Sequence, residues 1–418
     1  MQALFLLAGN NTRFYPLNTG AHKAMTMLYG KPLVAYAVES FMKCGIRDFV
    51  FVVKGNTEEL RTYFQNWDIT AQFAVQPEAA GQGDAILCAK QYIHESFVVT
   101  NPYHIDEESE IQGIMKLFQE TDADGIIPGK YEERIHEYGA LILENNQIKG
   151  IIEKPKPGEE PSHYKATSSY VFKTTFLSYL ENDKSGHYSY ESAISRYASE
   201  HRILMYEIPK DHAAASLKYP WQLLKIKNII ARNTKGYVNP HASVASTAVI
   251  SPEAYIDDGA RIMDGAHIIG HSYIGKDALV GNHAVVRDSS IEARVQVGVH
   301  SDIARSIIME GTHSHGGGFI GDSVIGRDCR LAYGFTVANK RLDREEIFGY
   351  IADKKIATGT NTLGVCLGNG VKTGIHVSLM PGVLVGAGAV LMSGVIAYHN
   401  VPEKMMVTYK QEQIHKQL

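Results

Sequence analysis

The stretch "ASVASTAVISPEAYIDDGARIMDGAHIIG" (residues 242–270) decides the fold, because an aliphatic residue returns in it at every sixth position. The period continues to residue 286, and a small residue stands two positions before each aliphatic one. A six-residue period fits neither an α-helix nor an ordinary strand. It fits a left-handed parallel β-helix of hexapeptide repeats, in which three hexads close one triangular coil. The aliphatic positions are Val244, Ile250, Ile256, Ile262, Ile268, Ile274, Val280 and Val286.

The period predicts the extent of this domain. It slips near Glu292, resumes at Phe319, is interrupted at about 340–362, and returns from Leu367 to Leu391. We therefore expect a β-helix over residues 242–402, followed by a C-terminal tail over 403–418.

The first half of the chain has a different pattern. Short apolar runs such as "ALFLLAG" (3–9), "FVFVV" (49–53) and "FVVT" (97–100) alternate with stretches of helical character. This alternation predicts an α/β domain with a mixed, mostly parallel, Rossmann-like sheet over residues 1–232. Gly236 and Pro240 between polar residues then indicate a linker over 233–241.

Composition narrows the functional classes. A length of 418 residues favours two domains, and a net charge of -4 argues against nucleic acid as a partner. The four cysteines lie far apart without a CxxC pair, which predicts free thiols and a cytoplasmic protein. Apolar runs stay below the roughly 20 residues of a membrane span, and the chain opens on a predicted strand. We therefore expect neither a membrane segment nor a signal peptide.

The loop after the first predicted strand has the character of a phosphate-binding loop. It reads Gly9-Asn10-Asn11-Thr12-Arg13, with one glycine where such loops normally carry two. Parallel sheets bind ligands beyond the carboxyl ends of their strands, which is where this loop lies.

Eight stretches in this order resemble the two-domain sugar-1-phosphate nucleotidylyltransferases, and most of all the bifunctional N-acetylglucosamine-1-phosphate uridylyltransferases with an acetyltransferase domain. They are "LAGNNTRFYPL", "HKAM…GKPL", "GQGDAI", "EYGALIL", "IIEKP", "KYPWQLL", "FIGDSVIG" and "TVANKR". The resemblance implies a reaction in which a sugar-1-phosphate attacks a nucleoside triphosphate and expels pyrophosphate. Such chemistry depends on positioning and on charge neutralisation.

The resemblance also implies roles for individual residues. Arg13 would hold the triphosphate and Lys23 the α- and leaving phosphates, both counted as catalytic. Nucleotide-binding residues would be Gly9, Asn10, Asn11, Thr12, Gln76, Gly81, Gly83 and Asp84. The sugar phosphate would be bound by Tyr138, Gly139, Glu153 and Lys154. The alternative is that Arg13, Lys23 and Lys154 are solvated surface cations.

Several positions depart from the family pattern. The resemblance implies Mg²⁺ as cofactor, held by an Asp after the fourth strand and by an Asp or Asn before the "YPW" segment. Here these places carry Asn101, within Thr100–Pro102, and Ser216, so that Asp84 or Asp106 would have to replace them. The sugar-contacting Asn-x-Gly-x-Tyr pattern reads Ala166-Thr167-Ser168-Ser169-Tyr170.

The β-helix points to a second chemistry. In the resembling acetyltransferases a histidine serves as general base for the attacking amine, and acetyl-CoA is bound between subunits. The corresponding "THSHGGGFIGDS" (312–323) has His315 one position early and Phe319 in place of a tyrosine. His315 and Asn339 are the candidate catalytic residues, and His313, Lys340 and Arg341 the candidates for acetyl-CoA or its acceptor. The alternative is that His313 and His315 are turn residues.

Three functions remain open from the sequence. The first is a sugar-1-phosphate nucleotidylyltransferase, alone or bifunctional with an amino-sugar-phosphate N-acetyltransferase. The second is an acetyl-CoA-dependent sugar acyltransferase whose first domain only binds. The third is a non-catalytic regulatory subunit that senses nucleotide sugars. For all three we expect a homotrimer assembled through residues 242–400.

Overall fold

The computed structural model describes residues 1–18, 20, 22–103, 108–183, 186, 189–209 and 217–410. Its contacts divide the chain into two compact units. The first contains Met1–Asn10 and Val34–Ala214, and the second contains Asn11–Leu33 and Ala215–Leu418. The predicted domain limits stay a prediction, since this division groups residues by contact. It nevertheless shows that a segment near the N-terminus packs with the C-terminal half of the chain.

A ten-stranded mixed sheet organises the first unit, in the order β10-β8-β9-β12-β7-β11-β6-β1-β4-β5. Strands β5, β4, β1 and β6 are parallel, and β11 lies antiparallel between β6 and β7. Every residue of β1 is buried, as expected for a parallel strand covered on both faces. The strands are β1 (Gln2–Leu7), β4 (Asp48–Val53), β5 (Thr70–Val75), β6 (Phe97–Thr100), β7 (Gly125–Tyr131), β8 (Gly139–Glu144), β9 (Gln147–Glu153), β10 (Tyr164–Ala166), β11 (Tyr170–Phe172) and β12 (Ile203–Glu207).

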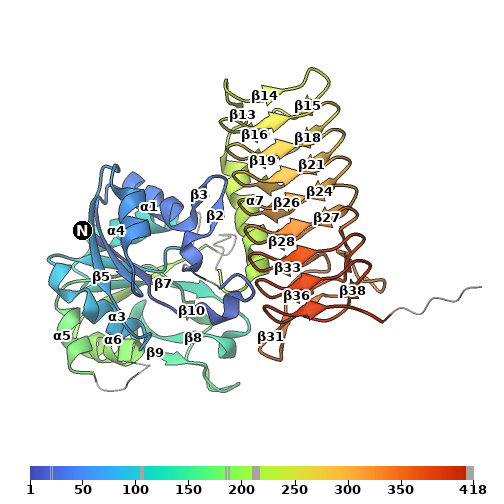
Figure 1. The fold of residues 1–418 in the computed structure, drawn as a ribbon. Coiled ribbons are helices and arrows are strands. Elements are labelled where there is room, and N and C mark those ends of the chain that lie inside the picture. Colours follow the sequence, from blue (N-terminus) through green and yellow to red (C-terminus); the bar gives the residue numbers. More distant parts are fainter. Residues whose placement is uncertain are drawn as a thin grey trace, which may run out of the picture. The chain divides into compact units, whose positions relative to one another are not determined.

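Amphipathic helices accompany this sheet (Figure 1), which confirms the predicted α/β class. Apolar side chains of α3, α5 and α6 share one core with the strands, including Ile86, Phe176 and Tyr197. The helices are α1 (Leu33–Lys43), α2 (Glu58–Phe64), α3 (Gln82–Cys88), α4 (Glu108–Glu120), α5 (Phe176–Glu181) and α6 (Ser189–Glu200), with single 3-10 turns η3 (Lys90–Tyr92) and η4 (Ile135–Glu137).

The second unit is built on the β-helix, confirmed as three ladders of short parallel strands (Figure 1). The predicted aliphatic positions point inward. The six of them from Ile256 to Val286 are each at most 1% exposed. Val244 is 38% exposed because the first coil is covered on one side only. The first face has β13 (Tyr237–Val238), β16 (Tyr255–Ile256), β19 (Tyr273–Ile274), β22 (Ser290–Ile291), β25 (Ile307–Ile308), β28 (Val324–Ile325), β33 (Cys366–Leu367) and β36 (Leu384–Val385).

The other two faces are built in the same way. The second has β14 (Ser243–Val244), β17 (Arg261–Ile262), β20 (Leu279–Val280), β23 (Gln296–Val297), β26 (His313–Ser314), β29 (Arg330–Leu331), β34 (Lys372–Thr373), β37 (Val390–Leu391) and β39 (Met406–Val407). The third has β15 (Val249–Ile250), β18 (His267–Ile269), β21 (Val285–Arg287), β24 (Asp302–Ala304) and β27 (Phe319–Gly321), then β30 (Thr336–Val337), β35 (Ser378–Leu379) and β38 (Ile396–Ala397).

The irregularities of the hexapeptide period have structural causes. Tyr255 pairs with Tyr273, 18 residues on, but Tyr273 pairs with Ser290, 17 residues on, so the coil has shortened by one residue. The predicted interruption at 340–362 contains an antiparallel hairpin of β31 (Phe348–Ile351) and β32 (Lys354–Ala357).

Both ends of the β-helix extend beyond the predicted limits. Tyr237–Val238, predicted as linker, form β13 and pair with β16. Met406–Val407, predicted as tail, form β39, and Val407 packs against the apolar interior. Each pair lacks the full hexad pattern because it supplies only part of a coil. Residues 411–418 lie outside the described part of the chain.

The second unit also contains non-helical and helical additions. The N-terminal segment Asn11–Leu33 has the turns η1 (Thr12–Phe14) and η2 (Lys23–Met25) and the hairpin strands β2 (Met27–Leu28) and β3 (Lys31–Pro32). The turn η6 (Pro220–Gln222) leads into α7 (Leu223–Asn233). No helix in the described ranges is long and apolar enough to span a membrane.

Candidate functional site

A pocket in the first unit lies at the carboxyl end of the parallel strands β1 and β6. Leu6, Val99 and Thr100 line it from these strands. The remaining lining residues are Gln82, Asn101, Thr167, Ser168, Ser169, Tyr170 and Tyr190. The structure therefore brings the position predicted to have lost a metal ligand and the altered sugar motif into one pocket. Open parallel sheets bind ligands at such a place.

The polar groups of this pocket are hydroxyls and amides. The Thr100 and Ser169 hydroxyls lie 2.9 Å apart within hydrogen-bond distance, and both side chains are buried. Ser169 holds a left-handed φ of 75°, a conformation that costs energy for a residue with a Cβ. The altered motif is thus fixed in place by a hydroxyl pair.

This donor set does not fit Mg²⁺, which prefers carboxylate oxygens. All ten lining residues are uncharged. Within the described ranges, no group of three or more His, Cys, Asp or Glu side chains is placed to hold a metal ion. The candidates Asp106 and Ser216 lie outside the described residues.

Gln76 organises the predicted base-binding loop. Its buried side chain donates to the Gly81 carbonyl at 3.1 Å and to Asp84 Oδ2 at 2.7 Å. The Asp84 carboxylate, at the start of α3, is therefore engaged by an amide. Gly83 is buried with no room for a Cβ, which would lie 2.5 Å from Ser189 Oγ. The close packing of α3 therefore explains why a glycine stands at position 83.

The four predicted sugar-phosphate residues come together where β8 begins and β9 ends, with Tyr138 just before β8 and Lys154 just after β9. Gly139 pairs with Glu153, and a Cβ on Gly139 would lie 2.7 Å from the Glu153 carboxylate. The Lys154 amide donates to the Tyr138 carbonyl at 3.0 Å. Glu153 and Lys154 are exposed, so both charged groups face solvent at one edge of the hairpin.

The predicted phosphate loop is divided between the two units. Gly9 and Asn10 end the N-terminal stretch of the first unit, where Lys54 Nζ donates to Asn10 Oδ1 at 2.7 Å. Asn11 takes a left-handed φ of 52°, a conformation that Asn tolerates better than most residues. Thr12 and Arg13 are the exposed residues of the turn η1 in the second unit.

Lys23 lies in the same segment and is held by a backbone carbonyl. Its ammonium donates to the Leu217 carbonyl at 2.5 Å. Burial, with the positive charges of Lys218 and Arg13, lowers the pKa of Lys23 to about 8. The charges of Arg13 and Lys218 thus act on Lys23 in addition to burial, and positive charges of this kind suit a polyphosphate anion.

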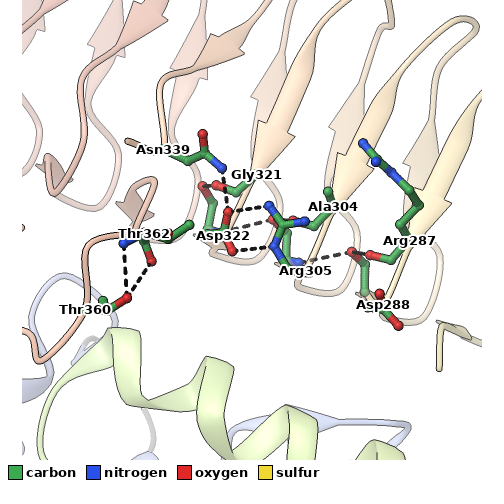
Figure 2. Close-up of polar contacts among 12 residues, drawn as sticks. Arg287, Asp288, Ala304, Arg305, Gly321, Asp322, Asn339, Thr360 and Thr362 are labelled. Atoms are coloured by element: carbon green, nitrogen blue, oxygen red, sulfur yellow. Dashed lines mark hydrogen bonds and ion pairs between the residues drawn. The ribbon is translucent and has the colours of Figure 1, made fainter. Parts of the chain in front are cut away.

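A ladder of polar side chains runs along one corner of the β-helix (Figure 2). Asp288, Arg305 and Asp322 have left-handed φ values of 45°, 52° and 51° and follow each other at intervals of 17 residues. Arg305 donates to both carboxylate oxygens of Asp322 at 2.7 and 2.8 Å. Asn339 Nδ2 donates to Asp322 Oδ2 at 2.5 Å.

These contacts orient the predicted catalytic amide. Because Asn339 turns its Nδ2 to Asp322, its carbonyl oxygen points away from the ladder (Figure 2). Asp322 is only 7% exposed, so the carboxylate that fixes this orientation is itself fixed. Asn339 is thus placed as a hydrogen-bond acceptor.

The two predicted histidines lie elsewhere on the coil. His313 is on β26, and burial together with Arg330 lowers its pKa. His315 follows β26 and is exposed. Both therefore precede β27 of the third face, whereas Asn339 follows β30 of that face. The β-helix histidines His283, His300 and His376 occupy left-handed corners, which explains why histidine is frequent in this domain.

The remaining candidates belong to the inserted loop. Lys340 and Arg341 are exposed. The Arg341 guanidinium forms a bidentate ion pair with Asp343, so its charge is already matched.

Sequence reasoning assigned no role to Arg305, Asp322, Glu292 or Lys227. The first two had a signal, since the 17-residue spacing continues from Asp288 to Asn339. Lys227 on α7 is 1% exposed and donates to the Asp288 carbonyl. Burial lowers the pKa of Lys227 to about 8.

Comparison with known families agrees with this geometry. The Nucleotidyl transferase profile matches residues 2–221, and the profile "Bacterial transferase hexapeptide (six repeats)" matches residues 253–288. The first match covers more than half of the chain.

Individual relatives match over the full length. The "Bifunctional protein GlmU" of Methanococcus maripaludis (strain C7) is 31% identical, covering 99% of this chain and 98% of the relative. The "Bifunctional sugar-1-phosphate nucleotidylyltransferase/acetyltransferase" of Sulfurisphaera tokodaii is 29% identical, covering 96% of this chain and 98% of the relative. Among solved structures, a UDP-glucose pyrophosphorylase from Acinetobacter baumanii aligns with a TM-score of 0.47 at 20% identity, over 55% of this chain and 92% of that one.

Proposed function

The chain belongs to the Nucleotidyl transferase family, and from this premise we propose that it transfers a nucleotidyl group from a nucleoside triphosphate to a sugar-1-phosphate. The products are a nucleoside diphosphate sugar and pyrophosphate. The observation that carries this proposal is the full-length similarity to the relative from Sulfurisphaera tokodaii, which is named for this reaction and for acetyl transfer. Both halves of that relative have a counterpart in this chain.

The proposed reaction needs alignment and positive charge. A sugar-phosphate oxygen attacks the α-phosphorus, and the bond to the β-phosphate oxygen breaks to release pyrophosphate. Arg13, Lys23 and Lys218 are the cations proposed to neutralise the polyphosphate. With a pKa of about 8, Lys23 is mostly protonated at neutral pH.

The sugar is proposed to bind through neutral groups. Hydroxyls and amides such as Thr100, Asn101 and Ser168 suit the hydroxyls of a sugar ring, and Lys154 is the cation for its phosphate. Since the described pocket residues do not fit Mg²⁺, the proposal includes no step through this metal.

Pyrophosphate release from a panel of nucleoside triphosphates and sugar-1-phosphates tests this function. We expect release with at least one pair, and none from the variant with both Arg13→Ala and Lys23→Ala. If the folded wild type binds a triphosphate but releases no pyrophosphate with any sugar phosphate, the first domain only binds, and the proposed transfer is wrong.

A second activity, acetyl transfer from acetyl-CoA to an amino-sugar phosphate, is favoured by the ladder at Asn339. The carbonyl that Asn339 directs outward would accept a hydrogen bond from the attacking amine, and His315 would take its proton. His315 precedes the third face along the chain, and Asn339 follows β30 of that face. We propose that the acetyl-transfer site combines residues of two subunits and that the chain forms a homotrimer.

Release of free thiol from acetyl-CoA, with glucosamine-1-phosphate and related amines as acceptors, tests the second activity. We expect release in the wild type and its loss in His315→Ala. Equal release from both proteins would exclude His315 as the base.

The four described cysteines of the protein are free thiols, which suits the proposed cytoplasmic location.

A further inference from the structure

The hairpin turn Tyr29–Gly30, in the segment that carries Arg13 and Lys23, is fastened to the β-helix by one buried carboxylate. The Tyr29 amide donates to Glu292 Oε1 at 2.9 Å, and the Gly30 amide donates to Glu292 Oε2 at 3.1 Å. Ser290 Oγ donates to Oε1 at 2.5 Å. Glu292 is 1% exposed, so water cannot replace these donors.

The conformation of the turn makes both amides available to Glu292. Met27 pairs with Pro32 and Leu28 with Lys31, which leaves Tyr29 and Gly30 as a two-residue loop. Their φ values are 51° and 73°, and positive φ at both central residues is typical of a type I′ hairpin turn.

Tyr29 is an unfavourable residue for this turn, because a left-handed conformation is costly for a bulky side chain. Its retention is explained by contacts with the β-helix. The Tyr29 hydroxyl donates to the His271 carbonyl at 2.6 Å, and its ring stacks on Tyr273 at 5.0 Å between centroids. Gly30 is required as well, because a Cβ would lie 2.5 Å from the Tyr273 hydroxyl.

Glu292 differs from its neighbours in the same column of the β-helix. Met309, Gly326 and Gly368 of the following coils and Gly275 of the preceding coil carry no charge, and Asp257, two coils before Glu292, is only half-buried. A carboxylate without solvent is costly unless donors satisfy it, and here the hairpin supplies two. The buried carboxylate therefore stands where the amides of the turn are available to satisfy it.

We infer that Glu292 is a positioning residue for nucleotidyl transfer: by fixing the Tyr29–Gly30 turn, it holds Arg13 and Lys23 in the arrangement that binds the polyphosphate. The inference rests on the proposed function. It assigns to the β-helix a part in the chemistry of the other half of the chain, separate from acetyl transfer. The segment begins at Asn11, directly after Asn10, the end of the first stretch of chain in the first unit, so its other end is tied to the predicted nucleotide loop by the chain itself.

Three full-length variants test the inference. Glu292→Ala removes both acceptors, and Glu292→Gln keeps one oxygen and turns an amide donor toward the other N–H. Glu253→Gln makes the same chemical change on an exposed β-helix carboxylate and serves as the matched control. Hydrogen exchange of a peptide over residues 27–32 measures how firmly Glu292 holds the hairpin. Calorimetry with four ribonucleoside triphosphates, dTTP and inorganic tripolyphosphate measures anion binding.

We expect the hydrogen-exchange rate of residues 27–32 and the dissociation constant of the bound anion to rise together. Both should increase from the wild type to Glu292→Gln and again to Glu292→Ala. The rise in Glu292→Ala should be about ten- to a hundredfold, as for one lost hydrogen bond to a charged group. In the transfer assay, KM for the triphosphate should rise while KM for the sugar phosphate stays constant. Glu253→Gln should match the wild type.

Two results would overturn the inference. One is faster exchange in Glu292→Ala with unchanged anion affinity, which would reduce Glu292 to a structural anchor. The other is weaker anion binding with the hairpin still protected. If wild-type protein binds no triphosphate, the proposed function fails and the positioning role fails with it, while exchange still shows whether Glu292 holds the hairpin.

Discussion

Substitution of Asp322 should destabilise the β-helix through two separable effects, the charge and the backbone. Asp322 accepts two hydrogen bonds from Arg305 and one from Asn339, and it does so at a φ of 51°. Asn has the same size and also tolerates the left-handed region, so Asp322→Asn removes the charge alone. Ala does not tolerate that region, so Asp322→Ala adds backbone strain.

The expected magnitudes follow from these contacts. Asn presents one acceptor and one donor to groups that all donate, so one or two charge-assisted hydrogen bonds are lost, at about 1.5–3 kcal/mol each. The Arg305 side chain is 46% exposed and regains water, which reduces the effect. We expect a loss of about 2–3 kcal/mol for Asn, and about 1–2 kcal/mol more for Ala from the left-handed backbone.

Thermal and urea unfolding provide the assay. For a unit of this size about 1 kcal/mol corresponds to 2–4 °C, so Asp322→Asn should melt clearly below the wild type. Asp328→Asn is the matched control, because Asp328 is exposed at another left-handed corner with a φ of 55°. Equal stability of Asp322→Asn and Asp328→Asn would refute the argument about the ladder. Equal stability of Asp322→Ala and Asp322→Asn would refute the argument about the backbone.

Three further predictions concern binding, pH and assembly. Arg13→Ala or Lys23→Ala should each weaken triphosphate binding by about 1.5–3 kcal/mol in calorimetry, and unchanged affinity in both would refute the cation cluster. Burial and Lys23 lower the pKa of His22 from 6.5 to about 3, so the stability contributed by neutral His22 should be lost as the pH falls from 6.5 toward 3. His22→Asn keeps an acceptor for the Ala24 amide, and its melting temperature should depend less on pH over this range than that of the wild type. Light scattering should give three times 46.2 kDa for the full chain, and a monomer would exclude a site shared between subunits.

The β-helix could be predicted in detail because its period is a direct consequence of its geometry. Each inward position must be apolar and each coil must close. Aliphatic residues such as Ile256 and Ile274 therefore recur at a fixed spacing, and this spacing predicts the fold. The ends could not be predicted, since β13 and β39 complete partial coils through backbone pairing. Backbone pairing puts little constraint on side chains.

The candidate site was predictable only in part. The motifs located the pocket residues Asn101 and Ser169, because substitutions within a known pattern are visible in sequence. Glu292 and the segment that it holds were not predictable, since a contact between residues 29 and 292 leaves no local pattern. The association of Asn11–Leu33 with the β-helix follows from such long-range hydrogen bonds.

The two compact units differ in the kind of chemistry that they offer. The pocket of the first unit contributes hydroxyls and amides, which in the proposed function would recognise a sugar by shape and hydrogen bonding. The second unit contributes Arg13, Lys23 and Lys218, whose charges are proposed to act on phosphate. Substitutions in the pocket should therefore change which sugar is accepted, whereas substitutions that release the segment should reduce transfer to every sugar alike. Because charge stabilisation is usually the largest contribution to phosphoryl transfer, the anchor at Glu292 should affect the rate more than any single hydroxyl of the pocket.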